Sequence, residues 1–145
     1  MTLKRTSHSV YEAKYHIVWC PKYRKRIEWG YGKERLESIF RRIGEEFDIE
    51  IEEMEVGSDH VHFLLSFPPR HSISKVVGIM KSISASKMFK EFGWLKEELW
   101  GGELWEDGYF VRTVGNQITT EIIKKYIENH REIDRAPSQL ELELG

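Results

Sequence analysis

The most constraining feature of this sequence is an apolar run that carries two histidines two residues apart, Asp59-His60-Val61-His62-Phe63-Leu64-Leu65. Side chains alternate between the two faces of a β-strand, so His60 and His62 share one face while Val61 and Phe63 point to the other. The run therefore predicts a strand with one face in the core and two imidazoles side by side on the other. Two such rings can form half of a metal site, although a pair of hydrogen-bonded surface histidines has the same spacing.

Hydrophobic periodicity predicts three more strands and three helices around this run. Gly57-Ser58 is the expected turn of a hairpin, a phase shift near Glu52-Glu53 indicates a β-bulge, and Ser72 is the expected cap of the second helix. The polar face of that helix carries Lys75, Lys81, Lys87 and Lys90. The expected elements, in chain order, are strand 11–20, a basic loop, helix 33–47, strand 48–56, strand 60–67, helix 73–92, strand 109–114 and helix 117–134.

The order of these elements predicts an α+β fold. The first six follow the βαββαβ pattern of ferredoxin-like (RRM-like) domains, in which two helices cover one face of an antiparallel sheet. The other face is then available for a site, and the two histidines belong to it. We expect a single domain over residues 1–145, with a loose tail at about 135–145.

Charge is distributed unevenly along the chain. The formal net charge is only -2, but residues 1–42 hold 11 Lys or Arg against 4 Asp or Glu. Residues 43–59 hold 8 acidic residues and no Lys or Arg. The basic excess is greatest in the segment 21–26, which suits phosphate binding, although a solvated loop has the same composition.

Targeting and redox signals are sparse. The sequence has no apolar run long enough to span a membrane, and its first ten residues lack the apolar centre of a signal peptide. Cys20 is the only cysteine, so no disulfide forms within the chain. These features lead us to expect a cytoplasmic protein with no membrane partner.

The last predicted helix supplies residues that fit the histidine pair. Tyr126 and His130 are four residues apart and therefore neighbours on one helix face. A tyrosine oxygen can attack phosphorus, and a divalent ion held by His60, His62 and His130 would bind the phosphate oxygens. A tyrosine in a helix stripe is equally expected in a packed core, so spacing alone leaves both readings open.

Taken together, these motifs resemble the single-tyrosine HUH transposases of the TnpA type, which small bacterial and archaeal insertion sequences carry. The resemblance covers nearly the whole chain. Its marks are the segments 15–24, 57–62, 99–100, 108–115 and 126–130.

The resemblance implies an enzyme that cuts and rejoins single-stranded DNA at the ends of a mobile element. Tyr126 would become joined to a 5′-phosphate, and His60 and His62 would bind Mg²⁺ or Mn²⁺. The third metal ligand, often glutamine in the family, is His130 here. The resemblance also implies a homodimer with composite active sites and recognition of DNA hairpins near the element ends. By resemblance and local charge, the expected DNA contacts are Lys14, Lys22, Tyr23, Arg24, Lys25, Arg26 and Arg112.

Three other readings of the sequence are possible. A domesticated relative would perform the same chemistry on repeated genomic palindromes. A ferredoxin-like nucleic-acid-binding module without catalysis would use the open sheet face for base stacking, but it gives the histidine pair and Tyr126 no joint role. A metal hydrolase that releases its product to water would not need Tyr126.

Overall fold

The computed structural model describes residues 4–5, 10–11, 13–99, 101–114 and 125. The predicted tyrosine helix (117–134, apart from Lys125) and the tail (135–145) lie outside this part of the chain. The strands are β1 (Lys4–Arg5), β2 (Val10–Tyr11), β3 (Lys14–Trp19), β4 (Glu50–Val56), β5 (Val61–Ser66) and β6 (Phe110–Val114), and the helices are a 3₁₀ turn η1 (Lys22–Arg24), α1 (Gly32–Phe47), α2 (Ile73–Glu91) and α3 (Trp94–Glu98).

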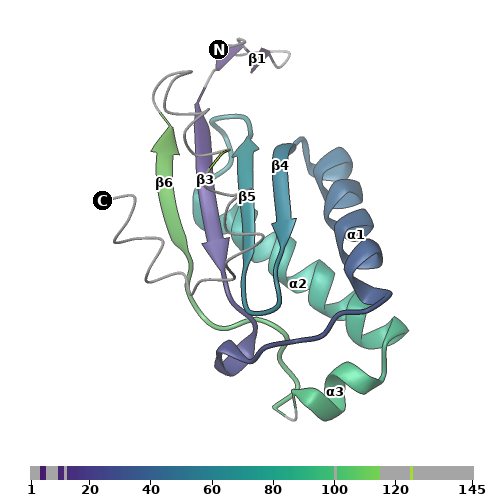
Figure 1. The fold of residues 1–145 in the computed structure, drawn as a ribbon. Helices are drawn as coiled ribbons and strands as arrows, with labels where there is room; N and C mark the ends of the chain where they lie inside the picture. Colours follow the sequence, from purple (N-terminus) through teal and green to yellow (C-terminus); the bar gives the residue numbers. More distant parts are fainter. Residues whose placement is uncertain (1–3, 6–9, 12, 100, 115–124, 126–145) are drawn as a thin grey trace.

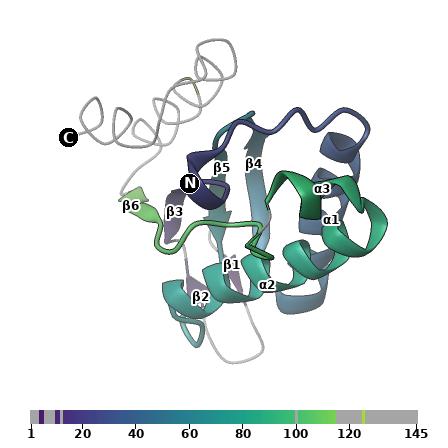
Figure 2. The ribbon, with the colours of Figure 1, turned by 90° about the horizontal axis from the view of Figure 1, so that it is seen from below.

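The predicted α+β fold is confirmed. Strands β3 to β6 form one antiparallel sheet in the order β4-β5-β3-β6, and helices α1 and α2 lie together on one side of it (Figures 1 and 2). Strand β5 is therefore central, between β3 and β4. Central strands are held by hydrogen bonds on both edges, which gives the histidine-bearing strand a fixed position.

The predicted hairpin and bulge are both present. The Gly57 N–H donates to the His60 carbonyl at 2.8 Å and closes the turn between β4 and β5. The register of the two strands shifts between Ile51 and Glu53, as the change of hydrophobic phase predicted. After this shift Glu55 stands directly opposite His62.

The first predicted strand, 11–20, is shorter than expected. β3 begins at Lys14, where β6 ends at its partner Val114. Tyr11 pairs instead with Lys4 in a small separate ribbon. The predicted basic loop also contains the 3₁₀ turn η1, because the Arg24 N–H donates to the Pro21 carbonyl at 2.9 Å.

Both long helices begin and end close to where the sequence predicts. The Ser72 hydroxyl accepts the Lys75 N–H at 3.1 Å and caps α2. α1 ends at Phe47 and is followed by Asp48, which adopts a left-handed conformation. The short helix α3 was not predicted, because it depends on burial of Leu95 rather than on a repeating pattern. Within the described residues, no helix has the length and apolar character needed to cross a membrane.

The core between sheet and helices is centred on four aromatic rings. Trp19 and Phe40 each contact Phe63, with ring centroids 4.9 Å apart in both pairs. Trp105 joins them at 6.0 Å from Trp19, and its indole N–H donates to the Ser84 hydroxyl at 2.9 Å. The segment between α3 and β6 is thereby fixed to the core.

Lys81 also fixes this segment, which differs from its expected place on the polar face of α2. Its Nζ donates to the carbonyls of Glu106 and Gly108, both at 2.7 Å, and lies 5.8 Å from the Trp19 ring centre. Burial lowers the pKa of this amine. A helix pattern assigns a lysine to solvent by its charge, but the long stem allows the amine to reach polar groups under a loop.

Candidate functional site

His60 and His62 lie side by side on the sheet face opposite the helices. Their ring centroids are 4.4 Å apart and their planes are inclined by 61°. The rings are buried, with 1% and 0% exposure respectively. On the other face Val61, Phe63 and Leu65 belong to the core, so the predicted alternation is confirmed. Metal binding by the pair stays a prediction.

Asp59 orients the first of these rings, a role that the sequence reasoning missed. Its Oδ1 lies 2.6 Å from Nδ1 of His60. A carboxylate only accepts hydrogen bonds, so Nδ1 carries the proton of this contact, and in the neutral ring Nε2 is then the nitrogen with the lone pair. Metal-binding histidines commonly have this arrangement, in which a carboxylate fixes the tautomer and the ring orientation. The available signal was an acidic residue directly before the pair.

These donors fit a divalent ion as far as they are described. Neutral imidazole nitrogens suit Zn²⁺ best, and they can also bind Mn²⁺ and, less typically, Mg²⁺, two ions that otherwise prefer oxygen ligands. Among residues 4–5, 10–11, 13–99, 101–114 and 125, no group of three or more His, Cys, Asp or Glu is placed to hold an ion. The third predicted ligand, His130, and the predicted nucleophile, Tyr126, are outside these ranges. The described residues therefore provide two of the three predicted ligands.

His16 extends the histidine pair to a third ring from β3. It is fully buried, and its ring centroid is 6.0 Å from that of His62. It also forms an edge-on pair with Phe110 on β6, with the ring centroids 6.0 Å apart. Alternation in the first strand indicates the face of His16, but which strand lies beside it depends on the sheet order. The contact was therefore not predictable from local pattern.

The basic segment 21–26 is tied to acidic residues. Lys22 Nζ lies 3.0 Å from Glu103 and 3.5 Å from Glu106, and its hydrogen bond to Glu103 raises the pKa of the lysine. Lys25 Nζ donates to the Glu98 carbonyl at 3.0 Å and lies 3.5 Å from the Glu98 carboxylate. Two of the predicted DNA contacts therefore already have carboxylate partners.

Tyr23 and Arg24 form a strained point in this segment. Both have left-handed φ angles, of 63° and 53°, which non-glycine residues rarely adopt. The Tyr23 N–H donates to a Glu106 carboxylate oxygen at 3.0 Å, which helps to hold the turn. Both side chains are exposed. Burial raises the pKa of the Cys20 thiol and the charge of Arg24 opposes that rise, so Arg24 stands near the end of β3.

The other predicted DNA contacts differ in their surroundings. Arg26 Nη1 lies 4.0 Å from Asp59 Oδ2, which connects the basic segment to the histidine pair. Arg112 is exposed on β6, directly opposite His16. Lys14 is buried, with Nζ 2.9 Å from Glu52, so DNA binding by this lysine requires that the ion pair open.

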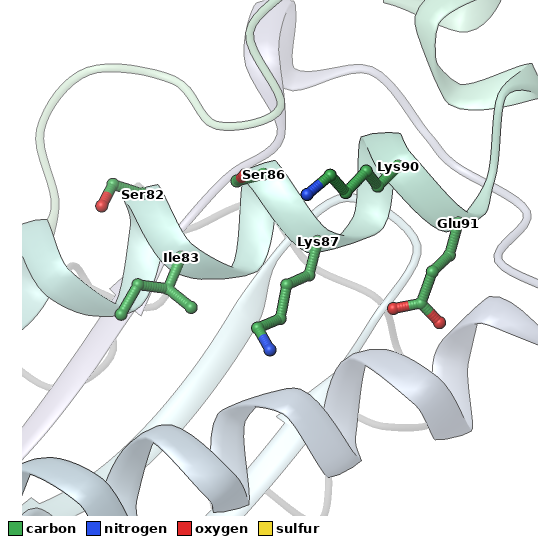
Figure 3. A pocket seen from close by; sticks show the side chains of 6 residues that line it. All are labelled: Ser82, Ile83, Ser86, Lys87, Lys90 and Glu91. Atoms are coloured by element: carbon green, nitrogen blue, oxygen red, sulfur yellow. The ribbon is translucent and has the colours of Figure 1, made fainter.

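A hollow of about 460 Å³ lies on α2, on the helical side of the sheet. Figure 3 shows Lys90 extending toward Ser86, while Lys87 extends toward α1. Glu91 in the same hollow forms two hydrogen bonds with the Arg35 guanidinium, at 2.7 and 3.0 Å. The helices and the sheet separate this surface from the histidines, so it is not part of the candidate centre, the site around His60 and His62.

The chain is similar to known sequences over most of its length. A family model described as "Transposase IS200 like" matches residues 9–130. The ISDra2 transposase TnpA of Deinococcus radiodurans is 39% identical over 132 residues, which is 91% of this chain and 94% of the relative. The transposase for insertion sequence element IS200 of Salmonella typhimurium is 37% identical over 139 residues, which is 96% and 90% of the two chains.

Solved structures share the fold. A crystal structure described as that of a transposase from Deinococcus radiodurans has a TM-score of 0.70 and 36% identity, and covers 87% of this chain and 96% of that one. A REP-associated tyrosine transposase bound to a REP hairpin has a TM-score of 0.61 and 12% identity, and covers 88% and 70%. At that identity the second likeness is one of fold.

Proposed function

The chain belongs to the IS200-like transposase family, and from this premise we propose that it cuts and rejoins single-stranded DNA through a covalent bond to Tyr126. The observation that carries the proposal is the pair of adjacent imidazoles, His60 and His62, with the Asp59 carboxylate 2.6 Å from Nδ1 of the first. This arrangement fixes the His60 ring in the orientation and tautomer that metal-binding histidines commonly have. A nucleic-acid-binding module without catalysis would have no use for it.

The proposed reaction is a transesterification. The Tyr126 oxygen attacks the scissile phosphorus, the bond from phosphorus to the 3′-oxygen breaks, and a bond from phosphorus to the tyrosine oxygen forms. The phenol loses a proton and the departing 3′-oxygen gains one. Attack by another 3′-hydroxyl reverses the step and releases Tyr126, so no external energy source is needed.

His60, His62 and His130 would hold the divalent ion of this centre. When bound, Mg²⁺ or Mn²⁺ would supply Lewis acidity toward the phosphate oxygens. Asp59 would keep the His60 ring in one tautomer and one orientation. Arg112 on β6 and Arg24 shortly after β3 are both exposed, and they would bind backbone phosphates of the DNA strand.

Partner and substrate form are proposed from the relatives. The REP-associated transposase is described as bound to a hairpin, which supports hairpin recognition by this chain as well. The proposed assembly is a homodimer whose subunits contribute to composite sites. The two relatives at 37–39% identity are transposases of insertion sequences. Their closer similarity favours action on a mobile element over action on dispersed palindromes.

The test is formation of a covalent protein–DNA product. We would incubate the protein with labelled single-stranded hairpin DNA from the region flanking its gene and Mg²⁺ or Mn²⁺, then separate the products under denaturing conditions. A slower-migrating band should appear and should be lost with chelator, in Tyr126→Phe and in His62→Ala. The matched control is Tyr31→Phe, which removes the same hydroxyl from a tyrosine that is 94% exposed.

Two outcomes would overturn parts of the proposal. Tyr109 is an exposed tyrosine directly before β6. A band that persists in Tyr126→Phe and disappears in Tyr109→Phe would show that Tyr109, and not Tyr126, is the nucleophile. Hairpin binding without a covalent band under either metal would support the non-catalytic module instead.

A further inference from the structure

A second hollow, of about 360 Å³, lies beside the basic segment. It is lined by Arg26 and Glu28 from the stretch between η1 and α1, and by Trp94 and Glu98 from α3. These two parts of the chain are far apart in sequence. The contacts of Lys25 with Glu98, at 3.0 Å to the carbonyl and 3.5 Å to the carboxylate, hold them together.

Trp94 gives this hollow an aromatic surface. Trp94 is 37% exposed and is one of the exposed large hydrophobic residues of the described part of the chain. Its ring is supported by Phe92, with the centroids 6.3 Å apart and the planes inclined by 67°. An exposed indole beside an arginine is a common platform for an unpaired nucleobase, which stacks on the ring.

The polar groups around the ring favour one base. Glu28 and Glu98 offer only acceptors, and Arg26 offers only donors. Guanine carries two adjacent N–H donors, N1–H and the 2-amino group, which match the two oxygens of a carboxylate, and it has the acceptors O6 and N7 for Arg26. Adenine and cytosine carry only a single amino group as donor. Thymine presents two carbonyl oxygens around its one N–H donor, and carboxylates repel those oxygens.

The hollow adjoins the candidate centre through Arg26. The guanidinium of Arg26 is 4.0 Å from Asp59, and Asp59 is 2.6 Å from His60. Arg26 therefore lines the hollow and also contacts the carboxylate that orients His60.

We propose that the hollow formed by Arg26, Glu28, Trp94 and Glu98 binds one unpaired guanine of the DNA strand that enters the candidate centre. This inference rests on the proposed function only in taking single-stranded DNA as the ligand. Stacking on Trp94 supplies affinity, and the carboxylates and Arg26 supply the preference for guanine.

The test is equilibrium binding of fluorescein-labelled oligonucleotides, measured by anisotropy in the presence of EDTA so that cleavage is not required. The probes are oligothymidylate and the same strand with one central guanine, inosine or 7-deazaguanine. The guanine strand should bind roughly tenfold more tightly than oligothymidylate, within the range expected for stacking and a paired polar edge. Inosine, which lacks the 2-amino group, and 7-deazaguanine, which lacks N7, should each lose part of this gain.

Variants then test whether the tighter binding of the guanine strand depends on the hollow. Trp94→Ala should remove most of it, Trp94→Phe should keep most of it, and Tyr31→Ala, at an exposed aromatic outside the hollow, should leave it unchanged. Glu28→Gln should reduce the preference for guanine without weakening oligothymidylate binding, because it removes a negative charge. The comparison of bases in the unmodified protein needs no variant, so a folding defect in Trp94→Ala leaves the test intact.

Equal binding of the guanine and thymine strands by the unmodified protein would overturn the proposal. An undiminished preference for guanine in Trp94→Ala would also overturn it. Covalent attachment of DNA to Tyr126 without any guanine preference would contradict the proposed guanine site but not the proposed cleavage. A guanine preference that depends on Trp94, without a covalent product, would support the guanine site and contradict the proposed cleavage.

Discussion

The Oδ1 atom of Asp59 lies 2.6 Å from Nδ1 of His60, so the first histidine of the pair is held by the residue directly before it. We predict that Asp59→Asn weakens Mn²⁺ binding about tenfold, because a neutral amide orients the ring less strongly than a carboxylate does. Calorimetric titration with Mn²⁺ measures this change.

The matched control for this prediction is Asp48→Asn. Asp48 follows α1 in a left-handed conformation that asparagine also tolerates, and its carboxylate pairs with Arg70 at the surface. Its replacement should leave Mn²⁺ binding unchanged. Equal affinities for Mn²⁺ in both variants and the unmodified protein would contradict the orienting role of Asp59.

Arg24 and Lys25 are adjacent, but their charges have different surroundings. Lys25 is held by Glu98, whereas the left-handed turn at Arg24 directs an exposed guanidinium near the end of β3. We predict that Arg24→Gln lowers the slope of log affinity against log salt by about 0.7, the value for one phosphate contact on a single strand. Lys25→Gln should change it less. Binding measured across a salt series compares the two, and an equal change in both variants would refute the distinction.

Lys81 is predicted to stabilise the segment before β6. Lys81→Met keeps the apolar stem but leaves the carbonyls of Glu106 and Gly108 without this donor. We expect the free energy of unfolding to fall by about 2 kcal/mol, as for loss of a charged hydrogen-bond partner. Urea denaturation measures it. Lys87→Met, at an exposed position of the same helix, should change it by less than about 0.5 kcal/mol, and similar losses in both would contradict the role.

The features that the sequence predicted depend on a single element, and those that it missed depend on contacts between elements. The faces of β5 and the bulge before Met54 follow from local periodicity, which side-chain geometry imposes on any strand. The contact of His16 with His62 depends on the sheet order, and the inward turn of Lys81 depends on carbonyls in a distant loop. Such contacts are set by tertiary packing, so a pattern within one element does not reveal them.

Gly44 shows how a residue that weakens a helix pattern is required by packing. A Cβ at this position would lie 2.6 Å from the Ile49 carbonyl oxygen, a backbone atom that has little room to move. We therefore predict that Gly44→Ala lowers the free energy of unfolding by about 1–3 kcal/mol through overpacking. Gly78→Ala on α2 meets no atom within 4 Å and should raise it by about 0.5–1 kcal/mol, because alanine favours helix. Thermal unfolding of the two variants measures these changes. A stabilised Gly44→Ala would contradict the prediction and would show that α1 and β4 can move apart at this point.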